Sequence, residues 1–77
     1  MREIVVAAAS DGRETRYLLE VVQEADHWVS TLGRFSETGE LESGRVAPRF
    51  YGTTVEQARR RMISVLENQY EEVRVEG

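Results

Sequence analysis

The segment from Gly52 to Tyr70 constrains the fold most strongly, because its sequence predicts a helix in several ways at once. Thr53 and Glu56 form a capping box, in which the hydroxyl accepts from the Glu56 N–H and the carboxylate accepts from the Thr53 N–H. Glu56 and Arg60 are an i, i+4 ion pair in the favourable order. One face of the predicted helix is apolar except at its end and carries Val55, Ala58, Met62, Val65, Leu66 and Gln69.

The rest of the chain is typical of strands joined by turns. Strands are predicted at Ile4–Ala9, Arg16–Gln23, His27–Phe35 and Glu71–Glu76. Asp11-Gly12 predicts a hairpin turn after the first strand, and Glu24-Ala25-Asp26 predicts a second turn. Ser36–Ser43 is polar and predicts a mobile loop. Gly44–Tyr51 is either an edge strand or an irregular segment, because Pro48 lacks the N–H that a central strand needs.

These elements predict one domain, residues 1–77, in the order β-β-β-(β)-α-β. A single amphipathic helix beside a sheet can bury its apolar stripe only against that sheet. The expected fold class is therefore α+β, an antiparallel β-meander of three to five strands with one α-helix packed on one face. A chain of this length buries roughly 60–65% of the surface that its unfolded form exposes, so its core is small.

Charge and composition exclude several classes of protein. The net charge is −4, from 14 acidic and 10 basic residues, which argues against a nucleic-acid or membrane-surface binder. The absence of cysteine excludes a disulfide framework, a thiolate metal site and a thiol nucleophile. No apolar stretch is long enough to span a bilayer, and the short run Ile4–Ala9 does not make a signal peptide. We expect a cytoplasmic protein.

No group of residues predicts catalysis. His27 is the only histidine, and none of the serines lies in a G-x-S-x-G motif. His27 and Asp26 are neighbours at a predicted turn, which is a poor spacing for a pair of metal ligands. We therefore expect a protein that is not an enzyme and that needs no metal and no cofactor.

Arginines and aromatic residues leave direct RNA or single-stranded DNA binding open as an alternative. Trp28, Phe35, Phe50 and Tyr51 are side chains on which bases stack in sheet-based binders. The basic run Arg59–Arg61 does not form one patch, however, because three consecutive helix positions fan over about 200°. Direct nucleic-acid binding is accordingly the less favoured class.

The apolar pattern of the strands favours an interface with another protein. Leu18, Val22, Val29 and Phe35 belong to a second sheet face that one short helix cannot cover. Such a face in a chain of this size predicts a homodimer or a larger partner. Acidic side chains in the loop would speed association with a basic partner. The candidate partner-binding residues are Glu37, Glu40, Glu42, Leu18, Val22 and Phe35.

Gly52–Ala58, with the sequence G-T-T-V-E-Q-A, resembles the G-x-T-x-E-E-A segment that begins the helix in HicB-like antitoxin domains. Tyr17–Glu24 and Trp28–Ser30 resemble the first hairpin of that family. The additional strand Ile4–Ala9 and the long acidic segment Ser36–Arg49 depart from the family pattern.

The resemblance implies a partial ribonuclease-H-like fold without catalytic activity, which often dimerises. Such a domain acts by occluding a partner ribonuclease toxin or another nucleic-acid-processing protein. The DNA-binding appendage of many family members is not present, so autorepression is not implied. A phage-encoded inhibitor that mimics the charge of a nucleic acid is an alternative with the same composition.

Overall fold

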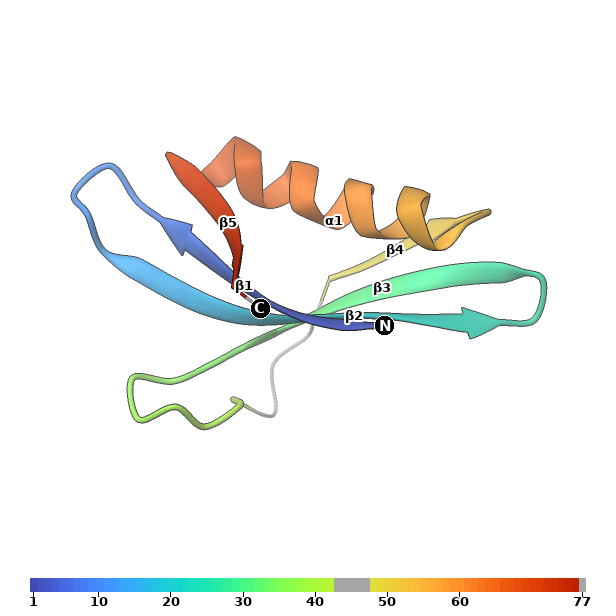
Figure 1. Ribbon diagram of the computed structural model, residues 1–77, viewed down its shortest axis with the longest axis horizontal. Coiled ribbons are helices and arrows are strands. Elements are labelled where there is room, and N and C mark those ends of the chain that lie inside the picture. Colours follow the sequence, from blue (N-terminus) through green and yellow to red (C-terminus); the bar gives the residue numbers. More distant parts are fainter. Residues whose placement is uncertain (43–47, 77) are drawn as a thin grey trace.

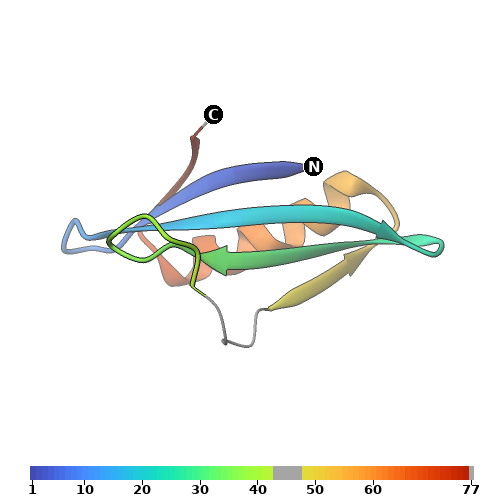
Figure 2. The same cartoon turned by 90° about the horizontal axis from the view of Figure 1, so that it is seen from below.

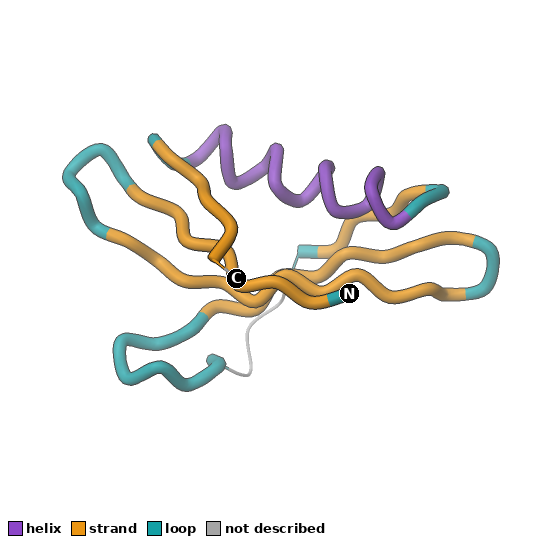
Figure 3. Tube along the Cα trace, in the orientation of Figure 1, coloured by secondary structure: helices purple, strands orange, loops and turns teal. Residues whose placement is uncertain are grey.

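The computed structural model describes residues 1–42 and 48–76 of the chain. In these residues the chain forms one helix and five strands, which Figure 1 labels and Figure 3 colours by type. In chain order they are β1 (Arg2–Ala8), β2 (Glu14–Glu24), β3 (His27–Arg34), β4 (Arg49–Gly52), α1 (Val55–Gln69) and β5 (Glu72–Glu76).

The five strands form one antiparallel sheet in the order β4-β3-β2-β1-β5. The first four strands are a meander. Helix α1 then lies across one face of the sheet and returns the chain to the far side of β1, where β5 pairs (Figure 1). The α+β fold predicted from the sequence is confirmed. Within residues 1–42 and 48–76, no helix is long and apolar enough to cross a membrane.

Both predicted turns are present; β1 and β2 are longer than the sequence indicated, and β3 ends one residue earlier. Gly12 has a φ of 88°, and the Ala9 N–H donates to the Arg13 carbonyl at 2.8 Å, which closes the first hairpin. Ala25 has a φ of 53° in the two-residue turn between β2 and β3. Tight hairpin turns need such left-handed residues, because their twist then matches that of the strands.

The N-cap of the helix lies one residue later than predicted. Thr54 is the N-cap, and its hydroxyl accepts from the Gln57 N–H at 3.1 Å. The Gln57 side chain in turn accepts from the Thr53 N–H at 2.7 Å. The predicted pairing of Thr53 with Glu56 is therefore wrong in register. Gln57 is at position N3, where a capping box has glutamate or glutamine, but its side chain accepts from the residue before the N-cap and not from the N-cap itself.

The core lies between α1 and the middle of the sheet. Met62, Ile63 and Leu66 pack against Leu19 and Val5. The predicted apolar face omitted Ile63, which is buried, and included Gln69, which is exposed. The stripe is therefore rotated toward Ile63.

One predicted ion pair on the helix has a different partner. Arg60 donates to Glu67 at 3.1 Å, in place of the predicted pair with Glu56. Both side chains are largely exposed.

The structure defines two segments between β3 and α1 more closely than the sequence did. Residues 36–42 of the loop that was predicted to be mobile form a hairpin, while Ser43 lies outside the described residues. The fourth strand is Arg49–Gly52, and it pairs with β3. Pro48 precedes it, and the remainder of the predicted strand, residues 44–47, is not among the described residues.

Candidate partner-binding surface

The sheet face opposite α1 carries no helix, and we call it the open face. Successive side chains of a strand point to opposite faces, so the residues that precede and follow each core residue in the sequence lie on the open face. Among the described residues, only the hairpin of residues 35–42 lies against it (Figures 1 and 2). The open face contains Ile4, Val6, Arg16, Leu18, Glu20, Val22, Val29, Thr31 and Tyr51.

Ion pairs between strands neutralise most of the charge on the open face. Arg2 pairs with Glu20 at 2.9 Å across β1 and β2. The other pairs join strands that are not adjacent: they are Arg16 with Glu76, Arg74 with Glu14, and Arg49 with Glu24, at 2.5, 2.8 and 2.8 Å. Hydrogen bonding to Arg74 lowers the pKa of Glu14, and the same bond raises the pKa of Arg74.

Long charged side chains also cover apolar residues of the open face. Val6 lies directly between Arg16 and Arg74 in the ladder and is buried, although no helix covers it. The methylene stems of arginines cover apolar neighbours while their guanidinium groups stay in water. Val29 is likewise buried, between the cross-strand residues Val22 and Tyr51. Val22 and Tyr51 themselves stay 47% and 51% exposed.

The hairpin of residues 35–42, which we call the acidic hairpin, extends β3 and turns under the open face (Figure 2). Backbone hydrogen bonds fix it, from the Ser36 N–H to the Glu40 carbonyl at 2.7 Å and from the Glu42 N–H to the Arg34 carbonyl at 2.8 Å. A bridge between Phe35 and Leu41 closes its base.

A side chain of the acidic hairpin also contacts the sheet itself. The Leu41 side chain lies directly over Gly33, where an added Cβ would be 2.9 Å from its Cδ1 atom. The hairpin is therefore positioned by both backbone bonds and packing.

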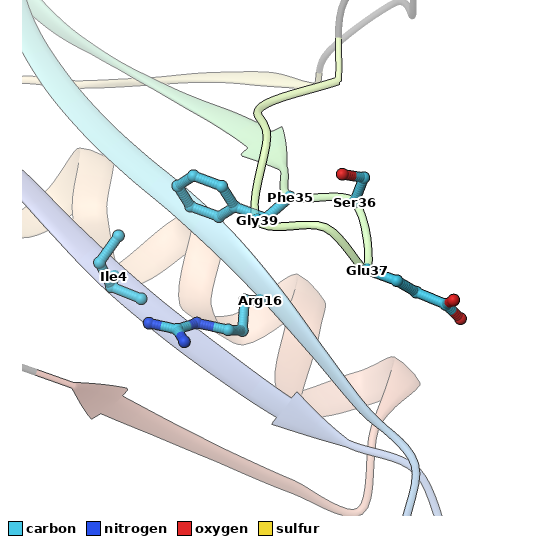
Figure 4. A pocket seen from close by; sticks show the side chains of 6 residues that line it. All are labelled: Ile4, Arg16, Phe35, Ser36, Glu37 and Gly39. Carbon is cyan, nitrogen blue, oxygen red and sulfur yellow. The ribbon is translucent and has the colours of Figure 1, made fainter.

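The acidic hairpin and the sheet enclose a shallow pocket of about 340 Å³. Figure 4 shows Ile4 on β1 and the Phe35 ring facing the pocket, with the Arg16 guanidinium beside Ile4. The Glu37 carboxylate points outward from the rim, toward solvent. Ser36 and Gly39 complete the lining. The pocket has an apolar floor and one acidic edge.

A broader hollow of about 790 Å³ shares part of this lining and reaches Arg34, Thr38 and Glu42. Glu42 is close to Arg34, at 3.7 Å, so its charge is partly matched. In the part of the chain that the structure describes, no ion pair involves Glu37 or Glu40. These two carboxylates are a local excess of negative charge.

Five of the six predicted contact residues are grouped at one end of the open face or on the hairpin below it. Phe35 and Glu37 line the same pocket, Glu40 and Glu42 lie on the same hairpin, and Leu18 is the cross-strand neighbour of Ile4. Val22 lies apart from them at the other end of β2, where Val29 separates it from Tyr51.

The sequence reasoning did not identify Ile4 or Arg16 as pocket residues. The alternation of side chains along β1 and β2 could have identified them, since Ile4 is two residues from Val6 and therefore lies on the same face of the sheet. The predicted start of the first strand at Ile4 hid that pattern, because no residue before it was assigned a face.

The side chains that would form a nucleic-acid platform do not gather on one surface. Trp28 and Phe50 alternate with open-face residues and point to the helix side, and Phe50 packs on the core. Tyr51 is on the open face, against His27 at 5.3 Å between ring centroids, whereas Phe35 belongs to the acidic hairpin.

The arginine run on the helix is also dispersed, and each member contacts a different group. Arg59 pairs with Glu3 at 2.5 Å, and this half-buried hydrogen bond raises the pKa of Arg59. Arg61 donates to the Tyr51 carbonyl at 2.5 Å. Neither guanidinium is therefore directed at a common ligand.

No protein-family profile, curated protein or solved structure matches this chain.

Proposed function

We propose that this protein is a non-catalytic binding module, of the antitoxin or inhibitor kind, that occludes a basic nucleic-acid-processing protein. The observation that carries the proposal is the acidic hairpin beside an apolar pocket. Most sheet charges on the open face are matched in pairs, with Glu72 on the edge strand as an exception, and Glu37 and Glu40 on the hairpin have no ion-pair partner among the described residues. An apolar centre with charge at its rim is the usual anatomy of a protein interface.

In the proposed mechanism, acidic side chains speed association and apolar side chains provide the affinity. Glu37 and Glu40 attract a basic surface and speed its association, an effect that salt weakens. Ile4, Leu18 and Phe35 then bury apolar side chains of the partner, which provides most of the affinity. A nuclease bound in this way loses access to its substrate, because its basic cleft is filled. The resemblance to HicB-like antitoxin domains supports the same class of partner.

Affinity capture from the source organism tests this proposal with a matched pair of variants. The first is Glu37→Gln/Glu40→Gln, which neutralises the hairpin. The control is Glu56→Gln/Glu71→Gln, which removes the same charge from exposed positions next to the helix. We expect the unmodified protein and the control to retain one stoichiometric basic protein, and the hairpin variant to lose it at physiological salt.

Two further measurements make the result decisive. The captured protein, once purified, should lose nuclease activity at one equivalent of the module. Equal capture by all three forms, or no stoichiometric partner, would refute the proposal. Binding of labelled oligonucleotides that weakens steeply with salt would support the alternative of direct nucleic-acid binding.

A further inference from the structure

Strand β5 is an edge of the sheet, and its outward backbone groups can be identified from the hydrogen bonds of β1. Met1 and Val21 exchange both N–H···O bonds at 2.9 Å, so odd residues of β1 bond to β2. Even residues of β1 therefore bond to β5, where Val6 is opposite Arg74. The N–H and C=O groups of Val73 and Val75 consequently point away from the sheet.

The opposite edge, β4, is protected by a contact that β5 lacks. The outward carbonyl of Tyr51 accepts from Arg61 at 2.5 Å. No described side chain makes a comparable contact with the backbone of Val73 or Val75, and the Val75 side chain is 43% exposed. Open edges of this kind are templates for pairing with another strand.

The charge pattern of β5 selects a second copy of this chain as the pairing strand. The sequence Glu72–Glu76 reads E-V-R-V-E and is symmetric about Arg74. Antiparallel self-pairing centred on Arg74 places two arginines opposite each other, which is unfavourable. Pairing centred on Val73 instead places Glu72 opposite the partner's Arg74, twice by symmetry.

The state of these side chains in the single chain favours the Val73 register. Glu72 is in no ion pair among residues 1–42 and 48–76, whereas Glu76 already pairs with Arg16 at 2.5 Å. Arg74 already pairs with Glu14 at 2.8 Å in any register, but a register centred on Val75 would bring it to a glutamate that is engaged as well. The Val73 register instead uses the carboxylate that is in no ion pair. Residues 72 and 74 would be a non-hydrogen-bonded pair, in which cross-strand side chains are closest.

We propose that two copies of this protein join through β5 in an antiparallel pairing centred on Val73, which makes one continuous sheet across a two-fold axis. The two Val73 residues exchange N–H···O bonds, and each Val75 N–H faces the partner's strand. The helices lie on the same side of the joined sheet. The open face and the acidic hairpin stay free, so this dimer does not rest on the function proposed above.

Charge exchange between two variants tests the register directly. Sedimentation equilibrium should give a mass about twice the chain's 8.8 kDa for the unmodified protein at high micromolar concentration. Glu72→Arg and Arg74→Glu should each raise the dimer dissociation constant about tenfold or more, since each turns two attractive contacts repulsive. An equimolar mixture of the two variants should dimerise again, because in a heterodimer the arginine introduced at position 72 faces the glutamate introduced at position 74.

Two controls separate this pairing from general charge effects and from unfolding. Glu56→Arg makes the same charge change on the exposed helix surface and should leave the dissociation constant unchanged. Val75→Pro removes an outward N–H without affecting the bonds to β1, so it should weaken the dimer while circular dichroism stays the same. A single-chain mass at every concentration, or a mixture that stays monomeric while both variants are folded, overturns the proposal.

Discussion

Replacing Gly52 with alanine should destabilise the protein, although the backbone conformation of this residue suits any amino acid. Gly52 is the buried last residue of β4, immediately before the turn into α1. An added Cβ would lie 2.6 Å from the Ala58 nitrogen and 3.1 Å from the Ala58 Cα. These are backbone atoms in the first turns of α1, so the helix must move away from the sheet.

The expected loss of stability combines two opposing contributions. Overpacking a core by a methyl group typically costs about 1–3 kcal/mol. Alanine recovers roughly 0.5–1 kcal/mol, because glycine loses more backbone freedom on folding. The net expected loss is about 1–2 kcal/mol. For a domain of this size, that corresponds to a decrease in Tm of about 5–15 °C.

Thermal and urea unfolding of Gly52→Ala measure this loss, and Gly33→Ala is the matched control. A Cβ at Gly33 would be 2.9 Å from the Cδ1 atom of Leu41, which is the far end of a flexible side chain on the open face. We expect Gly33→Ala to be neutral or slightly stabilising. An unchanged or higher Tm for Gly52→Ala would show that α1 does not approach β4 as closely as described.

Three other substitutions test the core, the half-buried ion pair and the dependence on pH. Met62→Asp should abolish cooperative unfolding, seen as loss of the thermal transition, because it buries an unpaired charge in the core. Glu3→Gln should cost about 1–2 kcal/mol in urea unfolding, because it leaves the half-buried Arg59 without its anion, and Glu3→Gln/Arg59→Met should recover part of that loss. The pKa of Glu14 is lowered in the folded state by Arg74, so its contribution to stability is complete above its usual value of 4.5 and is lost as the pH falls below it. Glu14→Gln should therefore reduce stability more at pH 7 than at pH 3, as measured by urea unfolding at both values.

The fold class followed from the sequence because its strongest signals are local. Alternation and the Asp11-Gly12 turn are set by a few adjacent residues, and both predicted hairpins are present. The cap was placed one residue too early because Thr53 and Thr54 both satisfy the capping pattern, with Glu56 and Gln57 respectively. Only the path of the preceding strand β4 decides between them.

The candidate site was harder to predict, because its residues are distant in sequence and are brought together only by the register in which the strands pair. Ile4 and Arg16 line one pocket with Phe35, and they come from three separate segments of the chain. The sequence predicted a polar loop here but not the bonds that position it, since those from Ser36 to Glu40 and from Glu42 to Arg34 depend on how β3 ends. The same limit applies to the charges. The sequence shows where the glutamates lie along the chain, but not which of them pair with an arginine across the sheet.

The size of α1 explains why the charges are arranged as they are. A helix of 15 residues is about 22 Å long, and the molecule extends 40 Å, so α1 covers one face and not its full length. The open face must therefore meet water, and paired arginines and glutamates make it polar while covering Val6. Exposed ion pairs contribute only about 0–1 kcal/mol each, so their main consequence is neutrality. A neutral sheet leaves the acidic hairpin as the local source of field, directly beside the pocket that a partner would fill.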